Sequence, residues 1–169
     1  MFAHKTALAA VAALLSSQAL AINGWVHNNC QSPIYVWTAA APGSIGCTGF
    51  CSSPLVQVAP GQGYQAAFQP LPDGDGGVTV KFTTSPDGMA TPYQAEFSER
   101  AGKIWYNWSG LNGSPLLGMR RSMQVGDGSS CAHSVCDAWS STCDWYKAPD
   151  GQELNVYDCP AGDLVMDIC

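Results

Sequence analysis

Apolar and polar side chains alternate along several short stretches of the chain. Over residues 78–83 (VTVKFT) the character changes at every step, which is the period of a strand with one buried face. A glycine-rich turn over 74–77 (GDGG) stands directly before it. Further short strands are predicted over 34–38, 63–69, 93–98, 103–109, 120–125 and 164–168, with proline, glycine, asparagine and aspartate between them.

This pattern predicts an all-β domain. After the first 21 residues no segment has a convincing helical period, and several short strands separated by turns are typical of a β-sandwich or barrel. Apolar residues make up 46% of the chain, so one domain can bury an adequate core. The cysteine-dense stretch 129–144 lacks the alternation, and we expect a disulfide-rich irregular region in the C-terminal third.

The first 21 residues have the layout of a secretory signal peptide. Lys5 precedes an uninterrupted apolar run over 7–15, and the small-x-small triplet 19–21 (ALA) follows. The run is too short to span a bilayer, and no later apolar stretch is long enough for a membrane helix. We therefore expect cleavage after Ala21, a single mature domain over 22–169, an extracellular location that includes the cell wall, and no membrane partner.

The charge balance is acidic and uneven. The formal net charge is -6, and residues 127–169 hold eight acids against one base. Nucleic acid is therefore a poor partner, because its phosphates attract basic proteins. The acidic third either lines a cleft or keeps a surface solvated, and the sequence leaves both open. It does not indicate an oligomeric state.

The cysteines form a framework. An even number in a small secreted domain predicts four disulfides, with 105 possible connectivities. A zinc site around Cys131, His133, Cys136 and Cys143 is the alternative, but an oxidising compartment disfavours free thiolates and no C-x-x-C pair occurs. The predicted disulfide residues are Cys30, Cys47, Cys51, Cys131, Cys136, Cys143, Cys159 and Cys169.

Several of these residues carry a family resemblance. Residues 24–30 (GWVHNNC) and 33–37 (PIYVW) resemble the opening of thaumatin-like proteins. The Asn-Asn-Cys opening, 104–106 (IWY), the cysteine-rich C-terminal third and the last cysteine resemble more closely the fungal Blastomyces yeast-phase-specific protein family of the thaumatin-like superfamily. The likeness implies a secreted thaumatin-like β-sandwich and a disulfide between the first and last cysteines, Cys30 and Cys169.

The resemblance is incomplete in two places. The usual Thr-Gly-Asp-Cys core of thaumatin-like proteins is missing, and 46–51 (GCTGFC) is a partial echo. Plant members are associated with an acidic cleft, β-glucan binding and sometimes weak glucanase activity, but the cleft's residues are not matched one by one in this chain.

The aromatic residues favour binding over catalysis. Residues 22–169 contain sixteen aromatic side chains, whose flat faces suit sugar rings. Trp105 and Trp108 lie three positions apart on one predicted strand and so point to opposite faces, which brings at least one of them out of the core. We predict both as ligand-binding residues. The favoured function is a non-catalytic binding protein for cell-wall polysaccharide such as β-glucan, or an effector-type factor acting on another organism.

Two alternatives remain, a weak β-glucan hydrolase with an acidic cleft and a structural cell-wall protein. Glycoside hydrolysis needs two carboxyl groups across one sugar bond, whereas Glu96 and Glu99 would point to opposite faces of their strand. Only His27 and His133 remain after residue 21, His133 has no identifiable partner and no G-x-S-x-G occurs, so no catalytic residue is assigned.

The sequence assigns no cofactor and no metal. The loop at Asp73 and Asp75 resembles a calcium loop only superficially, because a carboxylate is missing at its twelfth position, Thr84. Two sequons, at Asn107 and Asn112, are predicted N-glycosylation sites, which would make the protein a glycoprotein.

Overall fold

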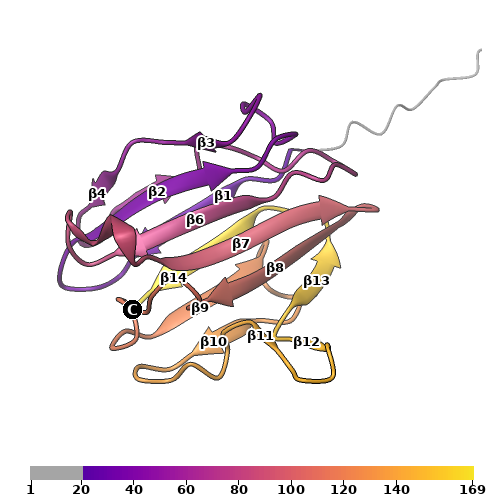
Figure 1. Cartoon of the computed structure of the whole chain (residues 1–169). Coiled ribbons are helices and arrows are strands. Elements are labelled where there is room, and N and C mark those ends of the chain that lie inside the picture. Colours follow the sequence, from indigo (N-terminus) through magenta and orange to yellow (C-terminus); the bar gives the residue numbers. More distant parts are fainter. Residues whose placement is uncertain (1–20) are drawn as a thin grey trace, which may run out of the picture.

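Two β-sheets lie face to face in the computed structural model, which describes residues 21–169 (Figure 1). The larger sheet has seven strands, in the order β13-β8-β7-β6-β2-β3 with β4 paired to β2. These are β2 (Ile34–Ala40), β3 (Cys51–Ser52), β4 (Val56–Val58), β6 (Val78–Thr83), β7 (Tyr93–Arg100), β8 (Lys103–Ser109) and β13 (Tyr157–Pro160).

The smaller sheet has five strands, in the order β10-β9-β14-β1-β5. They are β1 (Gly24–Asn28), β5 (Gly63–Gln65), β9 (Arg121–Val125), β10 (Ser134–Cys136) and β14 (Leu164–Ile168). A separate hairpin, β11 (Tyr146–Lys147) with β12 (Glu153–Leu154), and one 3-10 turn, Gly88–Ala90, complete the elements. The predicted all-β sandwich is confirmed. The predicted signal peptide, apart from Ala21, lies outside the described residues.

The core fills the space between the sheets because one face of each strand is apolar. In β6 the side chains of Val78, Val80 and Phe82 are buried, as the alternation predicts. On the facing sheet β14 buries Leu164 and Met166 in the same way. No helix among residues 21–169 is long and apolar enough to cross a membrane.

The predicted strand over 63–69 ends early. Beyond Gln65 the chain turns towards the larger sheet, and the backbone N–H of Ala67 donates to the Thr38 hydroxyl at 3.2 Å instead of joining a ladder. The predicted strand at 120–125 begins one residue later, at Arg121. The alternation did not reveal β1, which is five residues long. It also missed six strands of two to four residues, which are too short for an alternation to show: β3, β4, β10, β11, β12 and β13.

The first and last strands are neighbours. β1 pairs in parallel with β14 in the middle of the smaller sheet, with Gly24 opposite Leu164 and Asn28 opposite Ile168. Just beyond this pair a disulfide joins Cys30 to Cys169, which is the pairing that the family resemblance implies.

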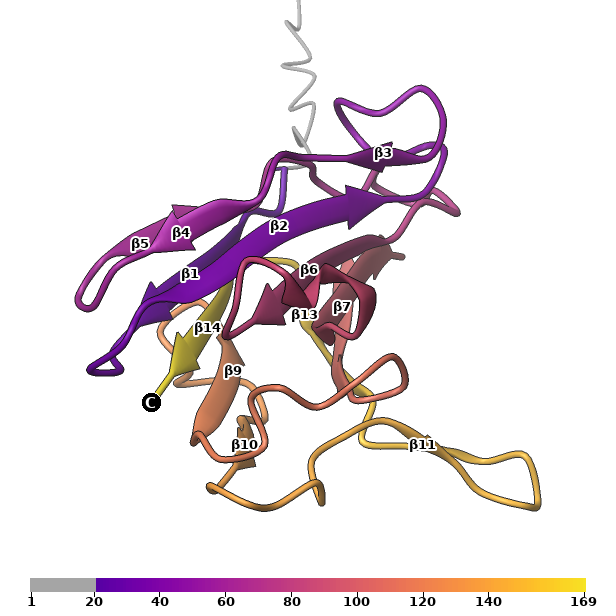
Figure 2. The ribbon, with the colours of Figure 1, turned by 60° about the vertical axis from the view of Figure 1, so that its left-hand side comes forward.

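Between β9 and β14 the chain forms a largely irregular excursion, which joins the two sheets at the edge strands β10 and β13. Disulfides Cys136–Cys143 and Cys131–Cys159 fasten it at two places. In Figure 2 its β11–β12 hairpin projects away from the sheets. This excursion forms one side of a groove on the larger sheet.

Candidate ligand-binding groove

A groove of about 780 Å³ lies on the outer face of the larger sheet. Small outward side chains of the central strands form part of its lining: Ala39 on β2 lies opposite Thr79 on β6, and Ser98 lies on β7. Neighbouring strands are about 4.8 Å apart, so a depression shared by β2, β6, β7 and β8 runs across the strands. Its lining residues come from β3 and the loop before it at one end and from the excursion, near β8, at the other. Figure 1 shows β3 and β8 on either side of β2, β6 and β7.

Aromatic side chains stand at the two ends of the groove. Trp105, on β8, is 40% exposed and lies opposite Ser98. Trp145 joins it from the excursion, and Phe50, 89% exposed, stands at the other end beside β3. An aromatic face that borders an open groove can stack against the apolar face of a ring.

Polar side chains lie between the aromatic ones. Glu96 sits between Thr79 and Asn107 in the strand register, and the Asn107 amide donates a hydrogen bond to its carboxylate at 2.9 Å. Lys81 and Arg100 also line the groove. Donors and acceptors beside aromatic faces are the chemistry that recognises hydroxyl groups on a ring.

A buried ion pair positions the Trp145 side of the groove. The Arg121 side chain is fully buried, and its Nη2 lies 3.2 Å from the Asp144 carboxylate. Its Nε donates to the Tyr93 hydroxyl at 2.6 Å, and the Tyr93 hydroxyl donates in turn to Asp144. Burial and this last bond raise the pKa of Tyr93 far above its ordinary value, so the phenol keeps its proton.

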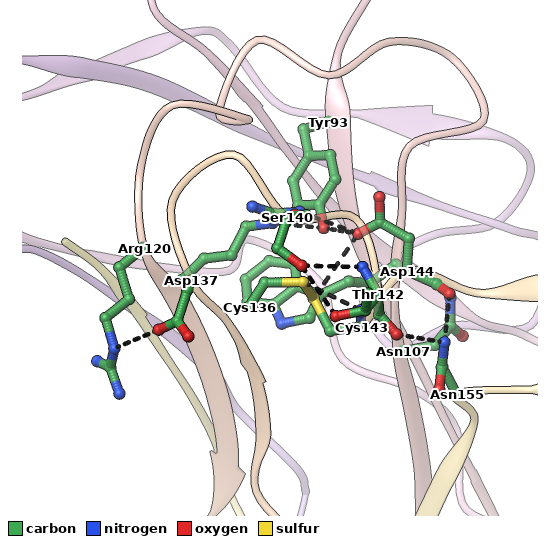
Figure 3. Close-up of a disulfide and its surroundings, with 12 residues drawn as sticks. Tyr93, Asn107, Arg120, Cys136, Asp137, Ser140, Thr142, Cys143, Asp144 and Asn155 are labelled. Atoms are coloured by element: carbon green, nitrogen blue, oxygen red, sulfur yellow. Dashed lines mark hydrogen bonds and ion pairs between the residues drawn. A yellow bond between two sulfur atoms is a disulfide. The ribbon is translucent and has the colours of Figure 1, made fainter.

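The network ties the excursion to the sheet. Tyr93 and Asp144 face each other beside the Cys136–Cys143 disulfide (Figure 3). The next residue, Trp145, donates its backbone N–H to the Trp108 carbonyl at 2.6 Å, beside an isolated parallel bridge between Asp144 and Trp108 at the end of β8. The groove wall is therefore anchored in the core.

The two tryptophans predicted to bind a ligand lie in different environments. Trp105 faces the groove, whereas Trp108 has no exposed surface and stacks on Tyr93 with ring centroids 5.5 Å apart. The prediction that Trp108 contacts a ligand is therefore wrong. The two residues point to opposite faces as expected, and the face of Trp108 is the core.

The two glutamates of β7 are also separated. Glu96 lines the groove, while Glu99 is 4% exposed on the inner face. Burial, with a smaller contribution from the Asp73 charge, raises the pKa of the Glu99 carboxyl. The pair cannot flank one sugar bond.

All eight cysteines are paired. The disulfides are Cys30–Cys169, Cys47–Cys51, Cys131–Cys159 and Cys136–Cys143. The zinc alternative is therefore wrong for this structure, because bonded sulfurs cannot act as thiolate ligands. His133 contacts the Gly128 carbonyl through Nε2 at 2.9 Å.

The two sequons lie in different surroundings. Asn107 is partly buried at the groove and uses its amide nitrogen to bind Glu96, whereas Asn112 is exposed in the loop after β8. Glycosylation at Asn112 stays a prediction, whereas at Asn107 the bond of the amide to Glu96 argues against it.

Sequence reasoning missed Phe50 and Trp145. The signal for Phe50 was its place between Cys47 and Cys51, since a disulfide across four positions turns the intervening side chains outward. Trp145 had no such signal, because its position depends on its neighbour Asp144, which pairs with the distant Arg121, and on its own bond to the Trp108 carbonyl.

The chain matches the family described as Blastomyces yeast-phase-specific protein over residues 11–169. The secreted thaumatin-like protein calA of Emericella nidulans is 29% identical over 127 residues, which are 73% of this chain and 67% of that protein. The crystal structure of the protein elicitor MoHrip2 from Magnaporthe oryzae superposes with a TM-score of 0.64 at 24% identity, covering 88% of this chain and 98% of that one.

A second solved structure, the thaumatin-like xylanase inhibitor TLXI, gives a TM-score of 0.50 at 16% identity over 86% of this chain and 98% of that one. The fold is thus a thaumatin-like β-sandwich, and the disulfides and the secreted relative place the protein outside the cell. The chain belongs to the Blastomyces yeast-phase-specific protein family.

Proposed function

We propose that this extracellular protein is a non-catalytic binding protein whose groove holds a chain of cell-wall polysaccharide, with β-glucan as the first candidate. The observation that carries the proposal is Trp105, exposed at the edge of an open groove beside Glu96 and Asn107. A sugar ring offers an apolar face to the indole and hydroxyl groups to the carboxylate and the amide.

The shape of the groove favours an extended ligand. It crosses the strands instead of forming a closed cavity, so a polymer can enter and leave along its axis. Two cationic side chains, Lys81 and Arg100, and two acidic ones, Glu96 and Glu153, line it. This balance suits a neutral polysaccharide better than a polyanion.

The relatives support a binding or effector role. One neighbour is described as a protein elicitor and another as a xylanase inhibitor. An effector-type factor that binds a protein is therefore the second candidate. Trp139, 78% exposed and outside the groove, is the observation that favours it, because exposed aromatic residues often anchor protein interfaces.

The test uses the secreted, oxidised protein with insoluble β-glucan, chitin and whole fungal cell walls. Sedimented protein and released sugar are measured in the same tubes. We expect binding without sugar release, and a loss of roughly tenfold in affinity for Trp105→Ala, the range expected for one aromatic contact.

The matched control is Trp139→Ala. Trp139 is 78% exposed and does not line the groove, so its removal should leave binding unchanged. Sugar release that increases with time would replace the proposal with the hydrolase alternative. Absence of binding to all three materials would overturn the polysaccharide assignment.

A further inference from the structure

We infer that Phe50 is a second stacking platform of the groove, so that the protein recognises a sugar chain by its length. This inference rests on the proposed function and adds the residue that reads the far end of the ligand. Phe50 lines the same groove as Trp105, on the same face of the sheet but at the end of the groove near β3.

The separation of the two platforms follows from the strand order. Phe50 directly precedes β3, Trp105 lies on β8, and the strands between them are β2, β6 and β7. Four strand spacings of about 4.8 Å place β3 and β8 about 19 Å apart. A single ring or a disaccharide cannot touch both platforms, whereas a longer oligosaccharide laid across the strands can.

The Phe50 side chain is held in place although it is exposed. The disulfide Cys47–Cys51 closes the loop that carries it. Cys47 is buried and Cys51 pairs with Ala40 of β2, so both ends of the loop are fixed to the sheet. A short closed loop loses little conformational entropy when a ligand binds. Most of the free energy of the contact with Phe50 therefore contributes to the affinity.

An apolar side chain with 89% of its surface in water gains nothing from the fold. Its burial by a ligand would remove that surface from water. Because Phe50 and Trp105 border one groove, a ligand that lies along the groove axis covers both.

The experiment measures the affinity of the oxidised protein for soluble β-glucan oligosaccharides of two to eight units by calorimetry. For the wild type, affinity should rise with length and then level off. Phe50→Ala should lower the affinity for the longest oligosaccharide about three- to tenfold and leave the disaccharide unaffected. Trp105→Ala should weaken binding at every length.

Two further variants separate the contact from folding. Val56→Ala removes a 41% exposed apolar side chain that does not line the groove, and it should change nothing. The double variant Cys47→Ser, Cys51→Ser keeps Phe50 but frees its loop, and it should lose affinity only for long oligosaccharides.

The outcomes distinguish this inference from the proposed function. If no oligosaccharide and no polysaccharide binds, the proposed function fails. If oligosaccharides bind with an affinity that does not depend on length, or if Phe50→Ala weakens the disaccharide and the longest chain equally, the far platform is refuted while the groove assignment stands.

Discussion

Replacing Arg121 by methionine tests whether the buried ion pair holds the excursion in place. Arg121 has no exposed surface, and besides Asp144 and Tyr93 it donates to the Ser140 carbonyl at 2.8 Å. Its guanidinium also lies 4.5 Å above the centre of the Tyr93 ring. Methionine keeps most of the volume but leaves the Asp144 carboxylate without its cation.

The expected loss is large for a single substitution. Removing one partner of a buried ion pair destabilises a protein by about 3–5 kcal/mol, because an uncompensated charge stays buried. For a domain of this size that corresponds to a fall in Tm of about 10 °C. The neighbouring residue provides the control: Arg120 is 54% exposed and lies 3.8 Å from an Asp137 carboxylate that is 87% exposed. Such a pair contributes less than about 1 kcal/mol.

The assay is urea unfolding of wild type, Arg121→Met and Arg120→Met, with the disulfides intact and tryptophan fluorescence as the readout. The three proteins are compared at an equal slope of unfolding free energy against urea concentration. A shift in the urea midpoint then reports a change in the free energy of unfolding. Equal losses for the two substitutions would refute the reasoning, because the structure attributes the whole difference to burial.

Three further predictions concern processing and pH. Mass spectrometry of the secreted protein should find Ile22 at the N-terminus, since Ile22 is 1% exposed and cleavage beyond it would remove a core side chain; a later start would contradict this. Burial raises the pKa of Glu99 in the folded state. The stability that its protonated carboxyl contributes is therefore fully present below the ordinary glutamate pKa, and it is lost as the pH rises through the folded-state pKa. Glu99→Gln should therefore be more stable than wild type near neutral pH and show no such gain in acid, and parallel pH profiles in thermal unfolding would refute it. Peptide mapping should find a glycan on Asn112 and none on Asn107, whose amide is bound to Glu96; a glycan on Asn107 would fill the groove and count against ligand binding there.

The sandwich could be predicted because apolar and polar residues alternate locally along its longer strands. Residues 78–83 and 164–168 form strands with the predicted bounds, since a period of two can be recognised without knowing a distant partner. The short strand β3 had no such period. It forms because Cys51 and Ser52 pair with Ala40 and Ala39 of β2. No local pattern in the sequence indicates that these two segments meet.

The groove was only half predictable. The spacing of Trp105 and Trp108 indicated that one of them leaves the core, but it did not say which. That choice depends on which face of β8 meets the other sheet. Part of the groove lining consists of small residues on separate strands, such as Ala39 and Thr79, which become neighbours only through strand register. A single sequence does not reveal that register.

The parallel pair β1–β14 has a consequence for biosynthesis. Strand β1 is made early, and its central partner β14 is made last; Cys30 and Cys169 are 139 positions apart in the sequence. At typical translation rates the gap lasts on the order of ten seconds, during which β1 has its β5 edge but not its β14 edge. The smaller sheet can close only once β14 has entered the secretory compartment, and a nascent chain arrested before residue 164 would leave the backbone edge of β1 that faces β14 unpaired and open to chaperones there.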